Sequence, residues 1–233
     1  MQHGSFRYKI DLAITTVPRA GDYIHLLLNR IDPSWLKVRV IVGQTDCSYL
    51  NRYRSNPQIE IIGGSTAEWA EFKNCRVHQR ASWNYWRALT LGLQTPDADG
   101  LLVFEDDVLP AIKWKRRLCE VIGSIEKAHG IRYVLALYTT LTVGHLPESK
   151  YIRYPVNLFF GTQGMYYPES VLEEFAGYLE EKGVRLCCAP YDLILQEYLS
   201  NLQIPLFATI PCLVQHVGEI STGLGDFHQA RHF

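Results

Sequence analysis

The sequence carries almost no net charge and contains no long hydrophobic run. Its 23 Lys and Arg residues nearly balance 24 Asp and Glu residues, so the formal net charge at pH 7 is −1. Without an overall basic field, the chain has no general attraction for nucleic acid or anionic lipid. No stretch approaches the roughly 18 consecutive apolar residues of a membrane-spanning helix. Residues 1–9 are polar and lack the apolar centre of a signal peptide, so we expect no transmembrane or secretory segment.

Cysteine patterns that bind zinc or build a disulfide framework are also missing. The six cysteines include no C-x-x-C pair, and Cys187 and Cys188 are adjacent, a spacing at which residues rarely bridge each other. The sequence contains no N-x-S/T acceptor for N-glycosylation. Together these absences predict a reduced, cytoplasmic protein.

The composition excludes a disordered chain, a collagen-like chain and a small disulfide-stapled scaffold. Of 233 residues, 47% are hydrophobic and 20% charged, an ordinary globular balance. One hydrophobic core can organise a chain of this length. No repeat, low-complexity segment or Pro/Gly/Ser-rich linker divides it, so we expect a single domain over residues 1–233. The 14 Tyr and 5 Trp residues can wall a pocket for a sugar or a base, although such rings also fill cores.

Hydrophobic periodicity predicts an α/β fold in which strands alternate with helices over about the first 140 residues. Apolar runs bounded by turn residues indicate strands at 8–15, 37–42, 58–62, 100–104 and 131–138. Helical spacing indicates helices at 23–30, capped by Asp22, and at 76–93 and 111–128. This alternation is typical of a mainly parallel central sheet with helices on both faces.

The remainder of the chain departs from this pattern. Residues 151–160 alternate like an antiparallel strand, and 206–214 indicate a strand interrupted by Pro211. Helices are expected at 168–182 and 190–201, and a loop or tail at 218–233. The central sheet is therefore expected to be mixed, although mainly parallel.

Three consecutive acids, Glu105, Asp106 and Asp107, directly follow the buried strand predicted at 100–104. Neighbouring carboxylates raise one another's pKa unless a positive charge lies between them. The carboxyl ends of strands in open α/β sheets are where ligands bind, and carboxylate oxygens suit hard cations such as Mg²⁺ and Mn²⁺. The cluster therefore indicates a divalent-cation site. A solvated acidic turn that caps the next helix is the alternative.

Two short motifs resemble those of nucleotide-sugar glycosyltransferases of the GT-A class. The sequence E-D-D-V at 105–108, after its apolar run, looks like a variant of the acidic D-x-D motif of that class. About 109 residues later, Q-H-V-G at 215–218 is similar to the closing motif of the N-acetylglucosaminyltransferase IV-like group, and Ser221 and Thr222 follow it. E-D-D alone is a weak signal, but the ordered pair of motifs is more specific.

The resemblance implies one GT-A-like, Rossmann-like domain. Residues 1–140 would mainly bind the nucleotide sugar, residues 141–217 would mainly form the acceptor side, and residues 218–233 would be a C-terminal loop or tail. It also implies a metal-dependent enzyme that uses a UDP-linked sugar as its donor.

Carried over from the family, Asp107 and His216 share the metal with the donor diphosphate. One carboxylate, one imidazole and two phosphate oxygens leave water positions on an octahedral Mn²⁺ or Mg²⁺. Glu105 and Asp106 would then bind hydroxyls of the donor ribose or sugar, or contact the metal through water. For His216, one of eight histidines, a capping or surface role is the alternative.

The donor nucleotide is expected between the first strand and the helix at 76–93. Thr15, Thr16 and Arg19 follow the first strand, where GT-A proteins hold the uracil and ribose, although an ordinary strand-to-helix turn explains them too. Three polar residues at i, i+4 and i+7 of the helix resemble the family's nucleotide-contacting helix: Arg80, Asn84 and Arg87. Planar Arg donors suit a diphosphate, whereas a solvated helix face is the alternative.

The acceptor side contains Asp192, an acid at the start of the otherwise apolar helix predicted at 190–201. In inverting GT-A enzymes an acid at this place is the general base, which implies that Asp192 takes the acceptor hydroxyl proton. Helix capping explains the same residue. Gly161 and Gly164 lie in a run that resembles the loop under the donor and acceptor sugars, where glycines permit close approach.

The leading hypothesis is a metal-dependent, inverting glycosyltransferase. The acceptor is left open among a glycan, a small metabolite, a lipid-linked sugar and a hydroxylated base of modified phage DNA. Two alternatives remain: a metal-dependent phosphoryl or nucleotidyl transferase, and a nucleotide- or carbohydrate-binding module without turnover. No P-loop motif supports the P-loop form of phosphoryl transfer.

Overall fold

Strands and helices alternate along the first half of the chain, as the hydrophobic pattern predicts. The computed structural model describes residues 8–19, 21–31, 37–92, 96–141, 145, 147–219, 229–230 and 232–233. The strands are β1 (Ile10–Thr16), β2 (Val38–Val42), β3 (Ile59–Ile62), β4 (Gly100–Glu105), β5 (Val108–Pro110), β6 (Val134–Ala136), β7 (Tyr151–Arg153), β8 (Gly164–Pro168), β9 (Leu206–Thr209) and β10 (Val214–His216). The α-helices are α1 (Tyr23–Arg30), α2 (Thr66–Phe72), α3 (Val77–Gly92), α4 (Trp114–His129), α5 (Glu169–Leu179) and α6 (Tyr191–Asn201).

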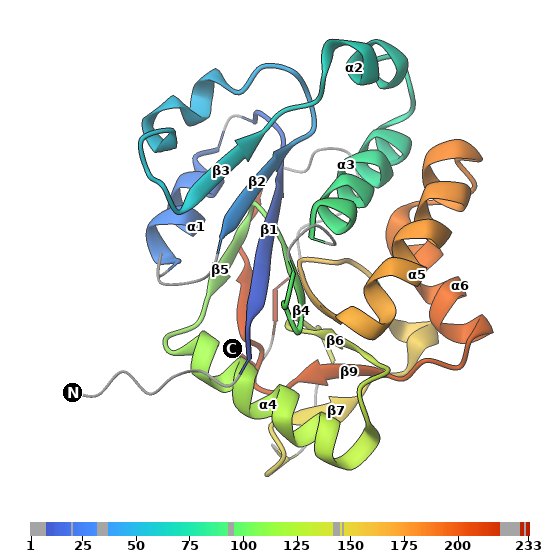
Figure 1. The fold of residues 1–233 in the computed structure, drawn as a ribbon. Helices are drawn as coiled ribbons and strands as arrows, with labels where there is room; N and C mark the ends of the chain where they lie inside the picture. Colours follow the sequence, from blue (N-terminus) through green and yellow to red (C-terminus); the bar gives the residue numbers. More distant parts are fainter. Residues whose placement is uncertain are drawn as a thin grey trace.

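Eight strands of the described residues form one mixed sheet in the order β3-β2-β1-β4-β8-β6-β9-β7 (Figure 1). β1 pairs in parallel with β2 and β4, and β2 pairs in parallel with β3. β8 runs antiparallel to β4 and β6, and β7 runs antiparallel to β9, whereas β6 and β9 are parallel. The predicted α/β fold with a mixed, mainly parallel sheet is confirmed.

The order of the strands reverses at β1. From β1 the chain continues outward through β2 and β3, and it then returns to place β4 on the other side of β1. At such a switch point the connections diverge and leave a crevice beyond the carboxyl ends of the two central strands, where α/β proteins bind ligands. The register pairs Thr15 with Glu105, so the ends of β1 and β4 meet at this crevice.

Apolar side chains on both faces of the sheet form two cores. α1 and α4 cover one face, where Leu27 and Leu118 pack with Leu12 and Ile14 of β1. α3, α5 and α6 cover the other face, and Figure 1 shows these three helices together on one side. Burial of apolar surface on both faces makes the central strands nearly continuous hydrophobic runs, which is why they could be predicted. No helix among the described ranges has the length and apolarity needed to cross a bilayer.

Several predicted strands are shorter than expected. The strand expected at 151–160 ends at Arg153, because Pro155 lacks the N–H that a ladder requires, and a 3₁₀ turn follows at Val156–Leu158. The strand expected at 206–214 is two strands, β9 and β10, separated by Pro211 and belonging to different sheets. The strand expected at 131–138 is restricted to β6.

The loop expected around Gly164 was a wrong prediction. Gly164 begins β8, which inserts antiparallel between β4 and β6 in the middle of the sheet. A Cβ on Gly164 would approach Val214 and Phe104 at 3.1 and 3.3 Å, so this glycine serves close packing of the core. The signal for a strand was the β-forming run that follows Gly164, which glycines and polar residues upstream obscured.

Helix α2 was not predicted, although its start has a local signature. Ser65 Oγ accepts a hydrogen bond from the Glu68 backbone N–H, and Glu68 accepts one from the Ser65 N–H, which is a complete capping box. Asp22 precedes α1, where a helix cap was predicted, but its side chain makes no capping hydrogen bond. Its backbone carbonyl instead accepts hydrogen bonds from the N–H groups of His25 and Leu26. The tail expected at 218–233 lies mostly outside the described residues, as do Ser221 and Thr222.

Candidate functional site

A cavity of about 660 Å³ opens at the switch point, beyond the ends of β1, β2 and β4. Gly43 and Gln44 follow β2 and form part of its wall, and α3 forms another part. Seven of the residues predicted to bind the donor line this cavity: Thr15, Thr16, Arg19, Arg80, Asn84, Glu105 and Asp106. Residues separated by up to about ninety positions therefore converge on one space of ligand size.

Asp106 is anchored beneath the cavity by two side chains from the β1 end of the sheet. Thr16 Oγ1 donates a hydrogen bond of 2.5 Å to Asp106 Oδ2, and the Arg19 guanidinium forms an ion pair with Oδ1. Asp106 is almost completely buried. Burial outweighs the charge of Arg19 and raises the pKa of Asp106 to about 7. Arg19 and Thr16 both lower this pKa, so it would be higher still without these two partners.

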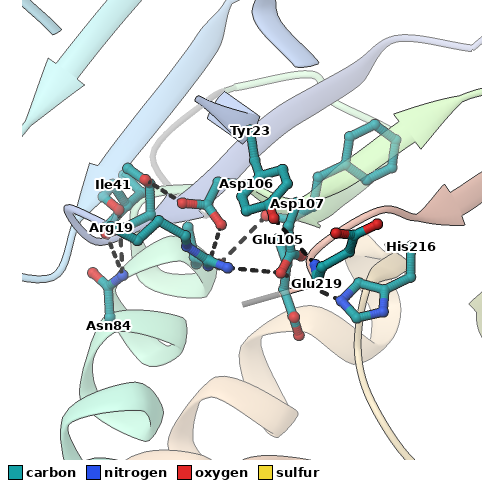
Figure 2. Close-up of polar contacts among 12 residues, drawn as sticks. Arg19, Tyr23, Ile41, Asn84, Glu105, Asp106, Asp107, His216 and Glu219 are labelled. Carbon is teal, nitrogen blue, oxygen red and sulfur yellow. Dashed lines mark hydrogen bonds and ion pairs between the residues drawn. The ribbon is translucent and has the colours of Figure 1, made fainter. Parts of the chain in front are cut away.

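Arg19 bridges two of the three acids, which was not predicted. Its Nη2 contacts Asp106, and its Nη1 lies 2.8 Å from Asp107 Oδ2, as Figure 2 shows. Burial lowers the pKa of Arg19, but the charges of Asp106 and Asp107 outweigh burial and raise it. The sequence feature that could have predicted such a bridge is the acidic cluster itself, because three adjacent carboxylates require a positive charge between them.

Asp107 and His216 meet although 109 residues separate them. β5 and β10 form a small antiparallel sheet in which His216 pairs with Val108, the residue after Asp107. His216 Nε2 lies 3.3 Å from Asp107 Oδ2, and both residues are buried (Figure 2). Burial opposes the ionisation of Asp107, but His216 and Arg19 outweigh it and lower its pKa. Neither β5 nor its pairing with β10 was predicted.

The segment after His216 wraps around Asp107. Val217 N–H donates a hydrogen bond of 2.8 Å to the Asp107 carbonyl, and Glu219 N–H donates one of 3.1 Å to the Tyr23 hydroxyl. Gly218 lies so close that a Cβ placed on it would overlap the Asp107 carboxylate. The Q-H-V-G motif therefore requires glycine at 218, because only a residue without a Cβ allows the backbone to approach the Asp107 carboxylate this closely.

A Gly218→Ala substitution is expected to displace the Asp107 carboxylate. Neighbours that orient a metal ligand typically contribute about 10- to 100-fold to metal affinity. The predicted role of Asp107 as a cation ligand therefore implies that Mn²⁺-assisted UDP binding weakens by at least about tenfold in this variant. The measurement is calorimetry with UDP in the presence of Mn²⁺. Gly177→Ala is the matched control, since a Cβ on Gly177 has no neighbour within 4 Å. Equal UDP affinity in both variants would show that the approach of Gly218 to Asp107 is unimportant for binding.

The chemistry of Asp107 and His216 fits two protein ligands of a divalent cation. Asp107 Oδ1 is buried without a hydrogen-bond partner, so the carboxylate has an unused acceptor. The 3.3 Å between Nε2 and Oδ2 is close to the roughly 3 Å that separates adjacent ligands of an octahedral ion with bonds of about 2.1 Å. Over the described ranges, no three His, Cys, Asp or Glu side chains gather as a complete metal site. Further ligands would have to come from a bound substrate and water.

Glu105 forms the wall between the cavity and α6. Its Oε1 accepts hydrogen bonds from the Thr162 hydroxyl at 2.9 Å and from the Tyr191 hydroxyl at 3.0 Å. Burial and then the charge of Asp107 raise the pKa of Glu105. Tyr191 stacks on Tyr85 with ring centroids 4.6 Å apart, and both rings line the cavity. This aromatic pair was not predicted, because aromatic content alone does not distinguish a pocket wall from a core.

The three polar residues predicted on one face of α3 separate into two environments. Arg80 donates to the Cys75 carbonyl, and Asn84 Nδ2 donates to the Ile41 carbonyl at 3.3 Å; both side chains line the cavity. Arg87 does not reach it. Its guanidinium donates to the carbonyls of Val42 and Gly63, and Arg87 is not among the residues that line the cavity, so its contact with the donor stays a prediction. Positions i and i+7 lie on the same side of a helix but about 10.5 Å apart along its axis, so the two side chains can have different neighbours.

Five predicted site residues besides Arg87 are not among the residues that line the cavity: Asp107, Gly161, Gly164, Asp192 and His216. Asp192 follows Tyr191 and is half-buried at the start of α6. Its carboxylate accepts hydrogen bonds from the Gly161 N–H at 3.2 Å and the Leu193 N–H at 3.0 Å. Gly161 has a φ of +73°, which glycine adopts without strain. The structure thus joins Asp192 to Gly161 beside the cavity and places Gly164 in the sheet.

Comparison with known proteins finds similarity among solved structures only. No protein-family model matches the sequence, and no curated protein is similar to it. One of the similar solved structures is that of the galactosyltransferase LgtC in complex with donor and acceptor sugar analogs. The alignment covers 81% of this chain and 70% of the LgtC chain, at 14% sequence identity and a TM-score of 0.47. At this identity the comparison does not extend to individual side chains, so the chemistry is argued from the residues of the cavity.

Proposed function

We propose that this chain is a divalent-cation-dependent glycosyltransferase that moves a sugar from a UDP-linked donor to an acceptor hydroxyl with inversion. The observation that carries the proposal is the cluster of Asp106, Asp107 and His216 beside a cavity of about 660 Å³ at the switch point of the sheet. Asp106 lines this cavity, and Asp107 contacts Arg19, which lines it too. A nucleotide sugar is an anion with a base, a ribose and a diphosphate, and the cavity offers stacking rings, hydroxyls and cations to match.

The residues have distinct roles in this proposal. Asp107 and His216 would hold the cation, and Arg19 and Arg80 would face the diphosphate. Thr15, Thr16 and Asn84 would bind the base and ribose, and Glu105 and Asp106 would bind hydroxyls of the ribose or sugar. When bound, a divalent cation would stabilise the negative charge that develops on the leaving diphosphate.

Asp192 is proposed as the general base. The acceptor oxygen forms a bond to the anomeric carbon while the bond from that carbon to the diphosphate oxygen breaks, and the hydroxyl proton passes to the Asp192 carboxylate. Two backbone N–H groups, from Gly161 and Leu193, orient that carboxylate. Its neighbour Tyr191 lines the donor cavity, so the base would lie at the border between donor and acceptor. The transition state would have oxocarbenium character.

A UDP-sugar panel with Mn²⁺ tests this function without knowledge of the acceptor. We expect slow release of UDP and free sugar, because glycosyltransferases often transfer to water, and we expect EDTA to abolish it. The products are identified by mass spectrometry, and proton NMR of the first sugar released gives its anomeric configuration. Asp107→Asn protein, purified identically, controls for contaminating hydrolases.

The same panel separates the alternatives. Release of UMP and a sugar phosphate would indicate phosphoryl or nucleotidyl chemistry instead. Binding without any product would indicate a nucleotide- or sugar-binding module. Retention of the donor's anomeric configuration would contradict inversion and leave the transferase assignment intact.

A further inference from the structure

The charge balance of the acidic cluster depends on Arg19. Among the described residues, Arg19 is the only Lys or Arg that forms an ion pair with Asp106 or Asp107. Its side chain is 13% exposed, and its Nε is buried without a hydrogen-bond partner. The guanidinium thus occupies the centre of a buried anionic site with one of its donors unused.

Arg19 shares its acceptor atom with the proposed cation site. Asp107 Oδ2 lies 2.8 Å from Arg19 Nη1 and 3.3 Å from His216 Nε2. A divalent cation bound between Asp107 and His216 would be adjacent to the guanidinium, and two cations repel strongly where water is excluded. Full occupancy of both positions is therefore unfavourable unless Arg19 moves or a further anion arrives.

Arg19 has an alternative partner within its reach. It lines the donor cavity and lies in the irregular segment between β1 and α1, so its side chain is not fixed by a helix or strand. The planar guanidinium can bind two phosphate oxygens at once, as it now binds two carboxylates. Its Cζ lies 5.8 Å from the centre of the Tyr23 ring, so the guanidinium also has an aromatic neighbour.

We propose that Arg19 is the internal counter-ion of the ligand-free site, and that it transfers from Asp107 to the donor diphosphate when the divalent cation binds. The inference rests on the proposed function. Its consequence is cooperativity: the cation binds weakly alone, because it must displace Arg19, and tightly with a nucleoside diphosphate, which accepts the displaced guanidinium. By thermodynamic linkage, the cation increases the affinity for the diphosphate by the same factor.

Binding of Mn²⁺ to nucleotide-free protein tests this role without turnover. Free Mn²⁺ is measured by electron paramagnetic resonance, with and without UDP. We expect UDP to tighten Mn²⁺ binding to the wild type by at least about tenfold. Arg19→Met keeps an unbranched apolar stem without the charge; it should bind Mn²⁺ at least about tenfold more tightly than the wild type, and its enhancement by UDP should be smaller.

Two further variants make the comparison specific. Arg19→Lys keeps the positive charge, so its nucleotide-free affinity for Mn²⁺ should stay near that of the wild type. Arg116→Met removes the same charge from an exposed position on α4 and should change neither affinity nor coupling. If Arg19→Met fails to fold, Arg19→Gln, which also removes the charge, takes its place in the comparison.

The proposal is overturned if Arg19→Met binds Mn²⁺ no more tightly than the wild type, or if UDP leaves the Mn²⁺ affinity of the wild type unchanged. These results are distinct from failure of the proposed function, which the UDP-sugar panel reports through its products. Tighter Mn²⁺ binding by Arg19→Met in a protein that transfers no sugar would support the counter-ion role and reject the transferase assignment.

Discussion

The Asp107→Asn variant is expected to lose turnover by at least about 10³-fold and to lose Mn²⁺-assisted UDP binding. The amide has nearly the same shape as the carboxylate but carries no charge, so it is a poor ligand for a hard cation. Arg19 keeps its ion pair with Asp106 in this variant, so the free energy of unfolding should fall by at most about 2 kcal/mol. The measurements are turnover, calorimetry with UDP and Mn²⁺, and melting temperature.

Asp99→Asn is the matched control for this experiment. Asp99 precedes the same strand, β4, at its opposite end and is exposed, where it accepts a hydrogen bond from the Lys9 N–H. We expect that variant to bind UDP and turn over like the wild type. Unchanged Mn²⁺-assisted UDP affinity in Asp107→Asn would remove Asp107 from the cation site.

The Asp192→Asn variant is expected to turn over about 10²- to 10⁴-fold more slowly while its affinity for UDP stays unchanged. Asparagine cannot take the proton of an acceptor hydroxyl. Its amide oxygen can still accept one of the hydrogen bonds that Gly161 and Leu193 now donate, and no capping bond is lost, because the N-cap residue of α6 is Pro190. Melting temperature should therefore change little. Turnover, the UDP dissociation constant and melting temperature are measured on one preparation.

A second acid on the same helix provides the control. Glu197 is exposed on α6 and accepts a hydrogen bond from the Tyr178 hydroxyl, so Glu197→Gln should leave turnover unchanged. Wild-type turnover in Asp192→Asn would exclude the base role and the main support for inversion. Loss of UDP affinity together with turnover would instead assign Asp192 to donor binding.

Local sequence pattern determined most of the elements around the site. The strands that became β1, β2, β3 and β4 are apolar runs closed by turn residues, and burial on both faces requires such runs. The three acids at the end of β4 were identified for the same reason, since their position directly after an apolar run follows from the sequence. The start of α2 was not predicted, although the Ser65–Glu68 capping box is a local signal of the same kind.

Long-range pairing determined which of these residues meet. β8 inserts between β4 and β6, and β10 pairs with β5. The residues around β8 and β10 in the chain do not specify these pairings, because the partner strands are distant in sequence. The resemblance to a known family paired Asp107 with His216, but the reason for the glycine at 218 appears only when the segment folds against Asp107. Likewise, Arg87 shares a helix with Asn84 and yet donates to carbonyls outside the cavity.

The sequence by itself determined the α/β class, the mixed and mainly parallel sheet, and the acids at the end of a central strand, because periodicity and burial act through neighbouring residues. Only the tertiary structure decided that Arg19 lies between Asp106 and Asp107. Three adjacent carboxylates in the sequence indicate that a positive charge lies nearby, but not which residue supplies it. That residue is Arg19, because the segment after β1 meets the end of β4 at the switch point and brings the guanidinium to within 2.8 Å of Asp107, 88 residues away.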